Sequence, residues 1–327
     1  MGVIYDEYFL SNSDDVFKNY SLSMLNLSRR YIPASSFSSQ VPTALGRRHY
    51  VYGENQPIHK ITYEPVISDG VMSCERAAVG VSEFTDVDVS LGLNFSVFNN
   101  KGEPLLWTEY PPVKRDGNTV SYLNETVLLV KSQRYSPSVY GHWLLDWLPE
   151  ILFFHRSGLQ YDSILIPDLP KFAVDIIEVL APELLNKLRS YDGSCDYIFK
   201  CKKLVLSSSF EATKHPMNFI DPVLLNTLNY YVDKALSGAK STCNIDKPFL
   251  FLSRQGEKRT LTNNNEISEM LSARGFYTPD LASLSFLDQV RLFRAANVIV
   301  APHGSALSNI IFCMKNTVIL ELFPEGY

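Results

Sequence analysis

Two residues able to exchange protons stand four positions apart in an apolar segment of this chain. In the stretch GHWLLDWLPEI, a helix would place His142 and Asp146 on the same face, and Glu150 would continue that face one turn later. A carboxylate oriented by an imidazole can act as a general base toward a hydroxyl group. An amphipathic helix with a structural polar stripe, packed through Trp143 and Trp147, fits the same residues when they are considered alone.

A second group of polar residues follows the apolar run NVIVA. His303, Gly304 and Ser305 come directly after this predicted strand, and a helix is predicted to begin near Ser305. A helix start at the carboxyl end of a parallel strand presents N–H groups and partial positive charge to phosphates. We expect His303 to donate a hydrogen bond, Gly304 to form a tight turn that admits a ligand, and Ser305 to cap the helix. Simple capping and packing fits the spacing equally well.

A basic loop follows the other apolar strand of this region, PFLFLS. It carries Arg254, Lys258 and Arg259, and guanidinium groups match phosphate oxygens in a two-pronged geometry. Charged loops are usually only solvated, but the position at the carboxyl end of a strand favours phosphate binding. The loop and the HGS turn together predict a diphosphate site.

Alternating strands and helices must position these groups. Between residue 60 and about residue 130, short apolar runs separated by Gly, Asn and Asp predict strands and hairpins. From Tyr140 onward a helix, the strand SILIP, a helix over 173–190 and the strands DYIFK and KLVLSS predict a parallel, doubly wound sheet. The polar segment 233–248 is interpreted as a domain boundary.

The C-terminal part alternates more clearly. After PFLFLS, a helix is predicted from the asparagines at 263–265, with Ile267, Met270 and Leu271 at helical spacing and Gly275 as its end. A second helix opens at Ser285 in a pattern like a capping box. NVIVA, the helix at Ser305 and the strand TVILELF complete the order. We therefore predict an N-terminal lobe over 1–240, β-rich over 1–125 and Rossmann-like over 126–240, and a nucleotide-binding Rossmann-like lobe over 241–327.

Composition narrows the class of protein. With 46% hydrophobic and 20% charged residues the chain is globular, and a net charge of −5 spread over both signs gives no footprint for nucleic acid. Five cysteines without a CxxC pair predict neither a disulfide framework nor a thiolate zinc site, and the histidines lack ligand spacing, so we expect no metal and no cofactor. GxSxG, GxGxxG and GxxxxGK[ST] motifs are missing from the sequence, which argues against a hydrolase elbow, dehydrogenases and P-loop enzymes.

Location follows from similar arguments. The N-terminus MGVIYDEYFLSNSDD is acidic and does not read as a signal peptide, and no stretch has the length of a membrane span. We expect a cytoplasmic protein whose membrane contact, where it exists, is peripheral at the inner face. Self-association is left open.

These motifs, taken together and in this order, resemble glycosyltransferase family 61, often described as capsular polysaccharide biosynthesis proteins. The resemblance rests on GHWLLDWLPEI and on the series from FLSRQGEKR through HGS and the NxxF of Asn309 and Phe312 to LELFP. It implies an α/β, GT-B-like fold with two Rossmann-like lobes facing a cleft. It also implies inverting, metal-independent transfer of a sugar from a nucleotide-sugar donor to a glycan acceptor in bacterial capsule or surface polysaccharide synthesis.

The resemblance further implies roles for single residues. Asp146, with His142, becomes the candidate base, and Glu321 is expected near the nucleotide ribose. The residues implied in donor binding are Arg254, Arg259, His303, Gly304, Ser305, Asn309 and Glu321. Two other classes stay open: a non-catalytic carbohydrate-binding subunit of a glycan-synthesis complex, and another nucleotide-dependent enzyme on a Rossmann-like scaffold.

Overall fold

A computed structural model describes the chain in segments that divide into two compact units. Unit 1 comprises 1–82 and 207–219, and unit 2 comprises 83–206 and 220–327. This division does not fall at the predicted boundary near residue 240, because both parallel sheets belong to unit 2. The described segments are 79–91, 95–107, 119–130, 136–193, 197–207, 221–239, 247–253 and 261–322, with the backbone of the strands at 29–32, 35–40, 47–53, 56–64 and 71–76.

Unit 1 contains antiparallel strand pairs. Strand β2 pairs with β5, β3 pairs with β4, and β1 pairs with the first residues of β6. The strands predicted from residue 60 onward are thereby confirmed where they fall in this unit. The bounds are β1 Arg29–Ile32, β2 Ser35–Gln40, β3 Arg47–Gly53, β4 Gln56–Glu64, β5 Val71–Arg76 and β6 Val79–Leu91.

A large mixed sheet has the strand order β11-β10-β9-β12-β6-β7-β8. Strands β9 to β12 form its parallel part, with β9 between β10 and β12, while β6, β7 and β8 are joined as antiparallel neighbours. The predicted parallel sheet is therefore confirmed, and the predicted hairpins extend it on one side. The bounds are β7 Phe95–Phe98, β8 Pro104–Trp107, β9 Thr119–Leu129, β10 Ser163–Pro167, β11 Leu188–Tyr191 and β12 Tyr197–Ser207.

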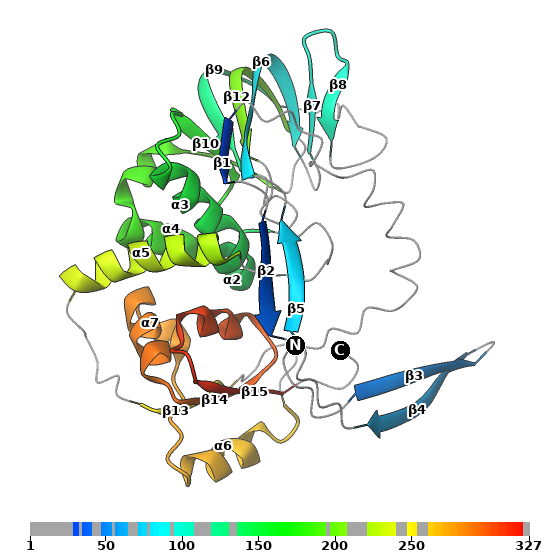
Figure 1. Ribbon diagram of the computed structural model, residues 1–327, viewed down its shortest axis with the longest axis vertical. Coiled ribbons are helices and arrows are strands. Elements are labelled where there is room, and N and C mark those ends of the chain that lie inside the picture. The colour runs from blue at the N-terminus through cyan, green and yellow to red at the C-terminus, as the bar shows by residue number, and fades with distance from the viewer. Residues whose placement is uncertain are drawn as a thin grey trace. The chain divides into compact units, whose positions relative to one another are not determined.

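Helices α3 and α4 both pack against α5 beside the large sheet (Figure 1). The helix predicted over 173–190 was too long: α4 ends at Leu180, because the residue before Pro182 is pushed out of helical geometry. Helix α5 also runs into the segment predicted as the domain boundary. The bounds are α3 Leu148–Arg156, α4 Lys171–Leu180, the 3₁₀ helix η4 Pro182–Lys187 and α5 Pro222–Gly238.

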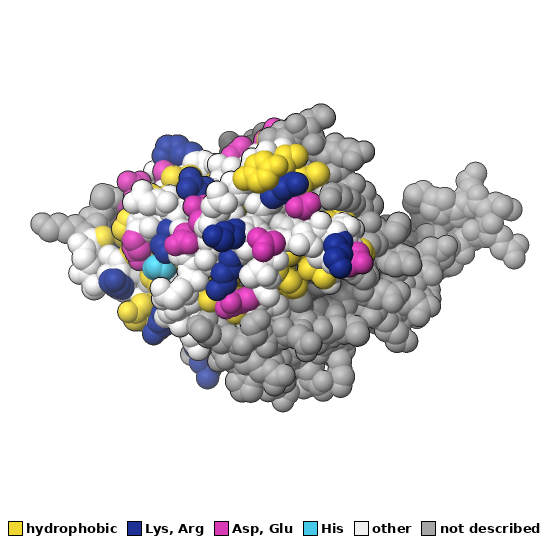
Figure 2. All heavy atoms as spheres, turned by 90° about the horizontal axis from the view of Figure 1, so that it is seen from above, with side chains coloured by type: hydrophobic (Ala, Val, Ile, Leu, Met, Phe, Trp, Pro, Cys, Tyr) yellow, Lys and Arg dark blue, Asp and Glu magenta, His cyan; other side chains and the backbone are white. Residues whose placement is uncertain are grey.

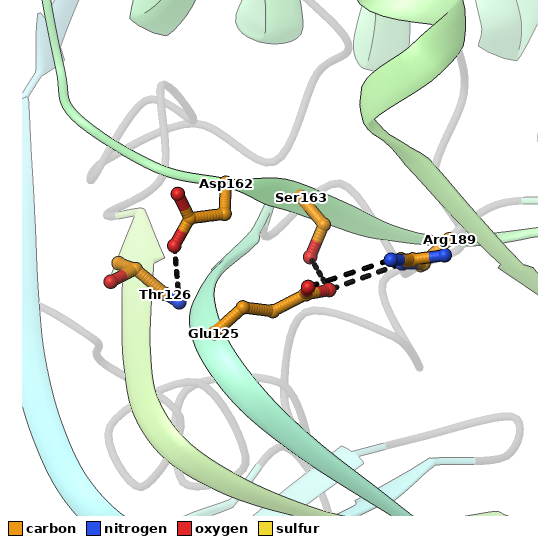
Figure 3. A network of polar contacts seen from close by, with 5 residues as sticks. All are labelled: Glu125, Thr126, Asp162, Ser163 and Arg189. Carbon is orange, nitrogen blue, oxygen red and sulfur yellow. Dashed lines mark hydrogen bonds and ion pairs between the residues drawn. The ribbon is translucent and has the colours of Figure 1, made fainter.

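One polar network joins three parallel strands of the large sheet. Figure 3 shows Glu125 of β9 reaching Ser163 of β10 and Arg189 of β11; Ser163 Oγ donates to Oε1 over 2.7 Å, and Arg189 Nε donates to Oε1 over 3.1 Å. The hydrogen bond from Arg189 is the main cause that lowers the pKa of Glu125. Because Ser163 is the first residue of β10, the network lies away from the carboxyl ends of the strands.

A small parallel sheet forms the C-terminal part of unit 2. Strands β13, β14 and β15 pair in this order, and a single bridge from Tyr277 to Leu250 adds a fourth position beside β13. Helices α6 and α7 lie on opposite sides of the sheet (Figure 1). The bounds are β13 Phe249–Phe251, β14 Val298–Pro302, β15 Val318–Leu322, α6 Asn264–Ser272, α7 Phe286–Ala295, and the 3₁₀ helices η5 Leu281–Ser283 and η6 Ser305–Phe312.

This order contains a topological switch point. After β13 the chain passes through α6 to Tyr277, on the side of β13 that faces away from β14. It then returns through α7 to β14, and after β14 it continues to β15 on the other side. The connections that follow the neighbouring strands β13 and β14 therefore run in opposite directions along the sheet. Open α/β sheets bind ligands in the crevice that such a divergence creates beyond the carboxyl ends of the strands. The loops after these two strands are the two that the sequence predicts to bind phosphate.

Local signals set the ends of these helices. The Ser285 side chain caps α7 by accepting from the Asp288 N–H over 3.2 Å, as the capping-box pattern predicts. Gly275 has φ 84°, a left-handed conformation that suits glycine and ends the turn after α6. Leu271 is buried against Phe251, whereas Met270, predicted on the same face, is 46% exposed.

Two further properties concern the surface and membranes. Among the described residues, no helix combines the length and apolar character that crossing a membrane requires. On the face seen in Figure 2, basic and acidic side chains are intermingled.

Candidate active site

A helix with one π-helical turn carries the proton-exchanging residues. It runs through α2 (Tyr140–His142), the π-helical segment η3 (Trp143–Trp147) and α3 without a break. The Leu148 N–H donates to the Trp143 carbonyl, five residues back. Pro149 follows directly and has no N–H to continue the α-helical pattern. The wider turn thus accommodates the proline inside the helix, and π-turns of this kind often occur at functional sites.

His142 and Asp146 form a pair, as their spacing predicts. Nδ1 of His142 lies 3.0 Å from Oδ2 of Asp146, and the side chains are 32% and 27% exposed. A protonated Nδ1 donates to the carboxylate, which fixes the ring and leaves Nε2 on its far side. The pair is therefore half-buried, ordered and within reach of solvent. Glu150, expected to continue this face, is instead only 5% exposed.

Apolar packing holds this pair in place. Trp143 and Trp147 on either side of Asp146 are fully buried, and Leu144 and Leu148 are buried beside them. The structure thus combines the two interpretations of this segment: the tryptophans form the core, and the polar pair lies on the remaining face of the same turn.

His303 follows β14 and is held from two directions. Its backbone N–H donates to the Leu322 carbonyl over 2.8 Å, and its ring Nδ1 lies 2.6 Å from Oε1 of Glu321 on β15. Glu321 was predicted near a nucleotide ribose; in the structure it contacts the imidazole. The carboxylate thereby fixes the ring orientation of His303 at the carboxyl end of the small sheet.

The start of η6 differs from the prediction in three respects. Gly304 has φ 163° and ψ 176°, so it is extended rather than in the predicted tight turn. The helix is 3₁₀, and its N-cap is Gly304 with no side-chain cap bond, so Ser305 does not cap it. The Leu307 N–H donates to the Gly304 carbonyl over 2.9 Å. The N–H groups of Ser305 and Ala306 precede this first bond, as at every helix start.

The basic loop with Arg254 and Arg259 lies outside the described residues, but both of its ends are defined. The Leu252 N–H donates to the Val300 carbonyl over 2.9 Å, so the chain leaves β13 beside the strand that leads to His303. At the other end, Asn264 Nδ2 donates to Ser253 Oγ over 3.0 Å. The loop therefore begins and ends at the switch point.

The helix carrying His142 packs directly on η6. A Cβ atom added to Gly141 would lie 2.7 Å from Ser308 Oγ and 3.8 Å from Ser305 Cα, so only glycine permits this approach without a shift. The two candidate halves of the site, which are more than 150 residues apart in sequence, are thus neighbours in space. Gly141 has no predicted role, and the signal that could have indicated one is a glycine between the bulky residues Tyr140 and His142.

Asn309 is part of the same contact. It is 1% exposed, accepts a hydrogen bond from the Tyr140 hydroxyl over 2.7 Å, and donates from Nδ2 to Gln289 Oε1 over 3.3 Å. In the structure it is buried between these two partners, and donor binding by Asn309 stays a prediction. No role was predicted for its partners Tyr140 and Gln289.

Comparison with known proteins identifies the class. The family described as Glycosyltransferase 61 matches residues 140–320, more than half of the chain. The match covers the His142–Asp146 pair, both ends of the basic loop and the HGS turn. The chain belongs to glycosyltransferase family 61, and it is a glycosyltransferase. This assignment decides against a non-catalytic subunit and against the other nucleotide-dependent classes.

Other comparisons give weaker likenesses. A structure of the dodecameric, iron-containing heptosyltransferase TibC with ADP-D-β-D-heptose shares 14% identity at a TM-score of 0.29, over 76% of this chain and 77% of that one. A second structure, the iron-containing dodecameric glycosyltransferase TibC of enterotoxigenic E. coli H10407, shares 13% identity at a TM-score of 0.27, over 76% and 75%. The comparison with curated proteins gave no significant match.

Proposed function

We propose that this glycosyltransferase transfers a sugar from a nucleotide-sugar donor to a glycan acceptor, with inversion and without a metal ion, between two Rossmann-like lobes arranged as in GT-B enzymes. The observation that carries the proposal is the packing of the helix bearing His142 and Asp146 on the start of η6. A proton acceptor and an anion-binding helix start are the two parts that an inverting transfer requires.

The donor side is built from the switch point of the small sheet. The diphosphate would lie beyond β13 and β14, against the first N–H groups of η6, with His303 held by Glu321 at its side. Arg254 and Arg259 would approach from the loop that begins beside β14. Two guanidinium groups and a helix start can neutralise the leaving diphosphate, and this is the reason for proposing that no divalent cation is needed.

The acceptor side is the His142–Asp146 pair. The pair takes the proton of the acceptor hydroxyl while the oxygen of that hydroxyl attacks the anomeric carbon of the donor sugar. The new glycosidic C–O bond forms on the face opposite the breaking bond to phosphate, and the nucleoside diphosphate leaves with the electron pair. We assign Asp146 as the proton acceptor, with His142 holding its carboxylate in position.

The setting of this reaction is also a proposal. The family resemblance suggests synthesis of a bacterial capsule or another surface polysaccharide. We place the protein in the cytoplasm, with peripheral contact at the inner face of the membrane, where such glycans are assembled.

Binding measurements test the donor site. Thermal shift with a panel of UDP-, GDP-, ADP- and CMP-sugars should identify one donor class, because a ligand that binds only the native state raises its stability. Calorimetry with the matching nucleotide should then show weaker binding for Arg254→Ala, and the control Lys171→Ala, an exposed cation on α4, should bind normally. Equal affinity of Arg254→Ala and the wild type would refute the phosphate assignment.

A further inference from the structure

The contact between the helix bearing His142 and η6 has two components, one polar and one steric. The polar component is a chain of hydrogen bonds from Tyr140 to Asn309 and from Asn309 to Gln289. Gln289 Nε2 in turn donates to the carbonyls of Leu281 and Leu284, over 2.9 and 3.3 Å. The chain thus begins two residues before His142 and ends in the loop that precedes α7.

The donor in this chain is well suited to a fixed geometry. Burial raises the pKa of Tyr140 above its ordinary value, and the protonated hydroxyl donates a hydrogen bond to Asn309. The ring of Tyr140 also packs edge-on against Phe172 of α4, with centroids 5.6 Å apart. The hydrogen bond to Asn309 and the packing on Phe172 together hold the Tyr140 side chain in one conformation. They thereby fix the direction of the helix that starts at this residue.

The steric component is the close approach at Gly141. A Cβ atom added there would meet Ser308 and Ser305, so the first turn of the helix lies close to η6. Tyr140 and Gly141 come directly before His142, so their contacts with η6 bear on where His142 and Asp146 stand relative to that helix start.

We propose that Tyr140 and Gly141 are positioning residues, which set the distance between the His142–Asp146 base and the donor diphosphate. This inference rests on the proposed function, since it assumes that the pair and the start of η6 act on the two ends of one reaction. Catalysis is sensitive to such distances: a displacement of about 1 Å costs about a hundredfold in rate.

The first test removes a single oxygen atom. Tyr140→Phe keeps the ring on Phe172 and deletes the hydrogen bond to Asn309. We expect kcat for donor hydrolysis and for transfer to fall by about ten- to a hundredfold, with an unchanged donor KM. The affinity and stoichiometry for the nucleoside diphosphate should also stay unchanged, which separates a shifted base from a misfolded fraction. A wild-type kcat in Tyr140→Phe overturns the proposal.

The second test uses a compensating pair of substitutions. Gly141→Ala introduces a methyl group 2.7 Å from Ser308 Oγ and should lower kcat, although alanine favours the helix more than glycine. Ser308→Ala removes that oxygen and should leave the rate unchanged by itself. In the double variant the clash is relieved and kcat should recover. A double variant as slow as Gly141→Ala overturns the steric part of the proposal.

A control separates this contact from contacts in general. Arg294 Nη2 of α7 lies 2.7 Å from Oδ1 of Asp233 on α5, and neither residue belongs to the contact of Tyr140 and Gly141 with η6. Asp233→Asn weakens that pair and should leave kcat unchanged. The substrate in all assays is the nucleotide sugar with the largest thermal shift. If the wild type neither binds nor hydrolyses any nucleotide sugar, the proposed function fails together with this inference. If the wild type is active and the Tyr140 and Gly141 variants are equally active, this inference alone fails.

Discussion

Replacing Asp146 by asparagine separates catalysis from folding more sharply than other substitutions in the chain. Asparagine has the same shape and keeps an oxygen that can accept from His142 Nδ1, so the 3.0 Å contact can persist. It cannot accept a proton from the acceptor hydroxyl. A positioned base contributes about a hundred- to ten-thousandfold in rate, which corresponds to about 3 to 5.5 kcal/mol of barrier.

The expected loss of stability is much smaller. Both side chains are about a third exposed, so the pair is screened by water and its loss should cost about 1 kcal/mol or less. Asp146→Asn should therefore lose almost all donor hydrolysis and transfer, while its Tm falls by less than about 4 °C and nucleoside diphosphate binding is retained. Asp175→Asn on the exposed side of α4 is the matched control and should remain active.

Two results would contradict this reasoning. If Asp146→Asn keeps more than about a tenth of the wild-type rate, Asp146 is not the base. If it loses activity only in proportion to the folded fraction, the pair is structural. His142→Gln completes the comparison: a loss as large as that of Asp146→Asn would indicate that the imidazole takes the proton and the carboxylate orients it, as in hydrolase triads.

Three further predictions concern other parts of the molecule. Glu321→Ala releases the His303 ring and should weaken nucleoside diphosphate binding by about tenfold in calorimetry, whereas Glu321→Gln, which keeps an acceptor oxygen, should weaken it less; a larger loss in the glutamine variant would favour a direct ribose contact. Phe293 of α7 is fully buried, so Phe293→Ala should lower the free energy of unfolding by about 3 to 5 kcal/mol in urea titrations. A loss below about 1 kcal/mol would show that the core around Phe293 is incomplete. The lowered pKa of Glu125 means that its stabilising contribution is present at neutral pH and is lost as the pH falls below about 4.5 and through the lowered value. Glu125→Gln should therefore lose less stability than the wild type between pH 7 and about pH 3; parallel pH curves would remove Glu125 as a contributor.

The sequence predicted the small sheet well because each of its elements carries several independent signals. Val298–Pro302 is apolar on both faces, the α7 cap combines Ser285 with Asp288, and Gly275 marks a left-handed end. Propensity, periodicity and turn chemistry agree there, and such agreement makes local interpretation reliable. The helix predicted over 173–190 lacked this agreement, because Pro182 contradicted its continuation.

The local contact of the candidate site was predictable from the sequence, and its long-range contacts were not. Spacing alone brings His142 to Asp146, and strand topology alone brings the end of β13 beside the strand that leads to His303. The hydrogen bond between Tyr140 and Asn309 joins residues 169 positions apart, and no local pattern encodes such a distance. The same holds for Glu321 and His303, whose contact depends on β15 pairing with β14. Burial is likewise not encoded locally: Asn309 is 1% exposed, and its residue type does not indicate this.

The π-turn at Trp143–Trp147 has a consequence for how such enzymes can vary. A π-turn is equivalent to one residue inserted into an α-helix, and one residue corresponds to a rotation of about 100°. Because of this insertion, the side chains before the π-turn point in a different direction, relative to the buried face of α3, than they would in a regular α-helix. A single-residue deletion in this turn would regularise the helix and rotate His142 relative to the core. Length changes here, unlike substitutions, can thus redirect chemistry while the hydrophobic interior stays in register.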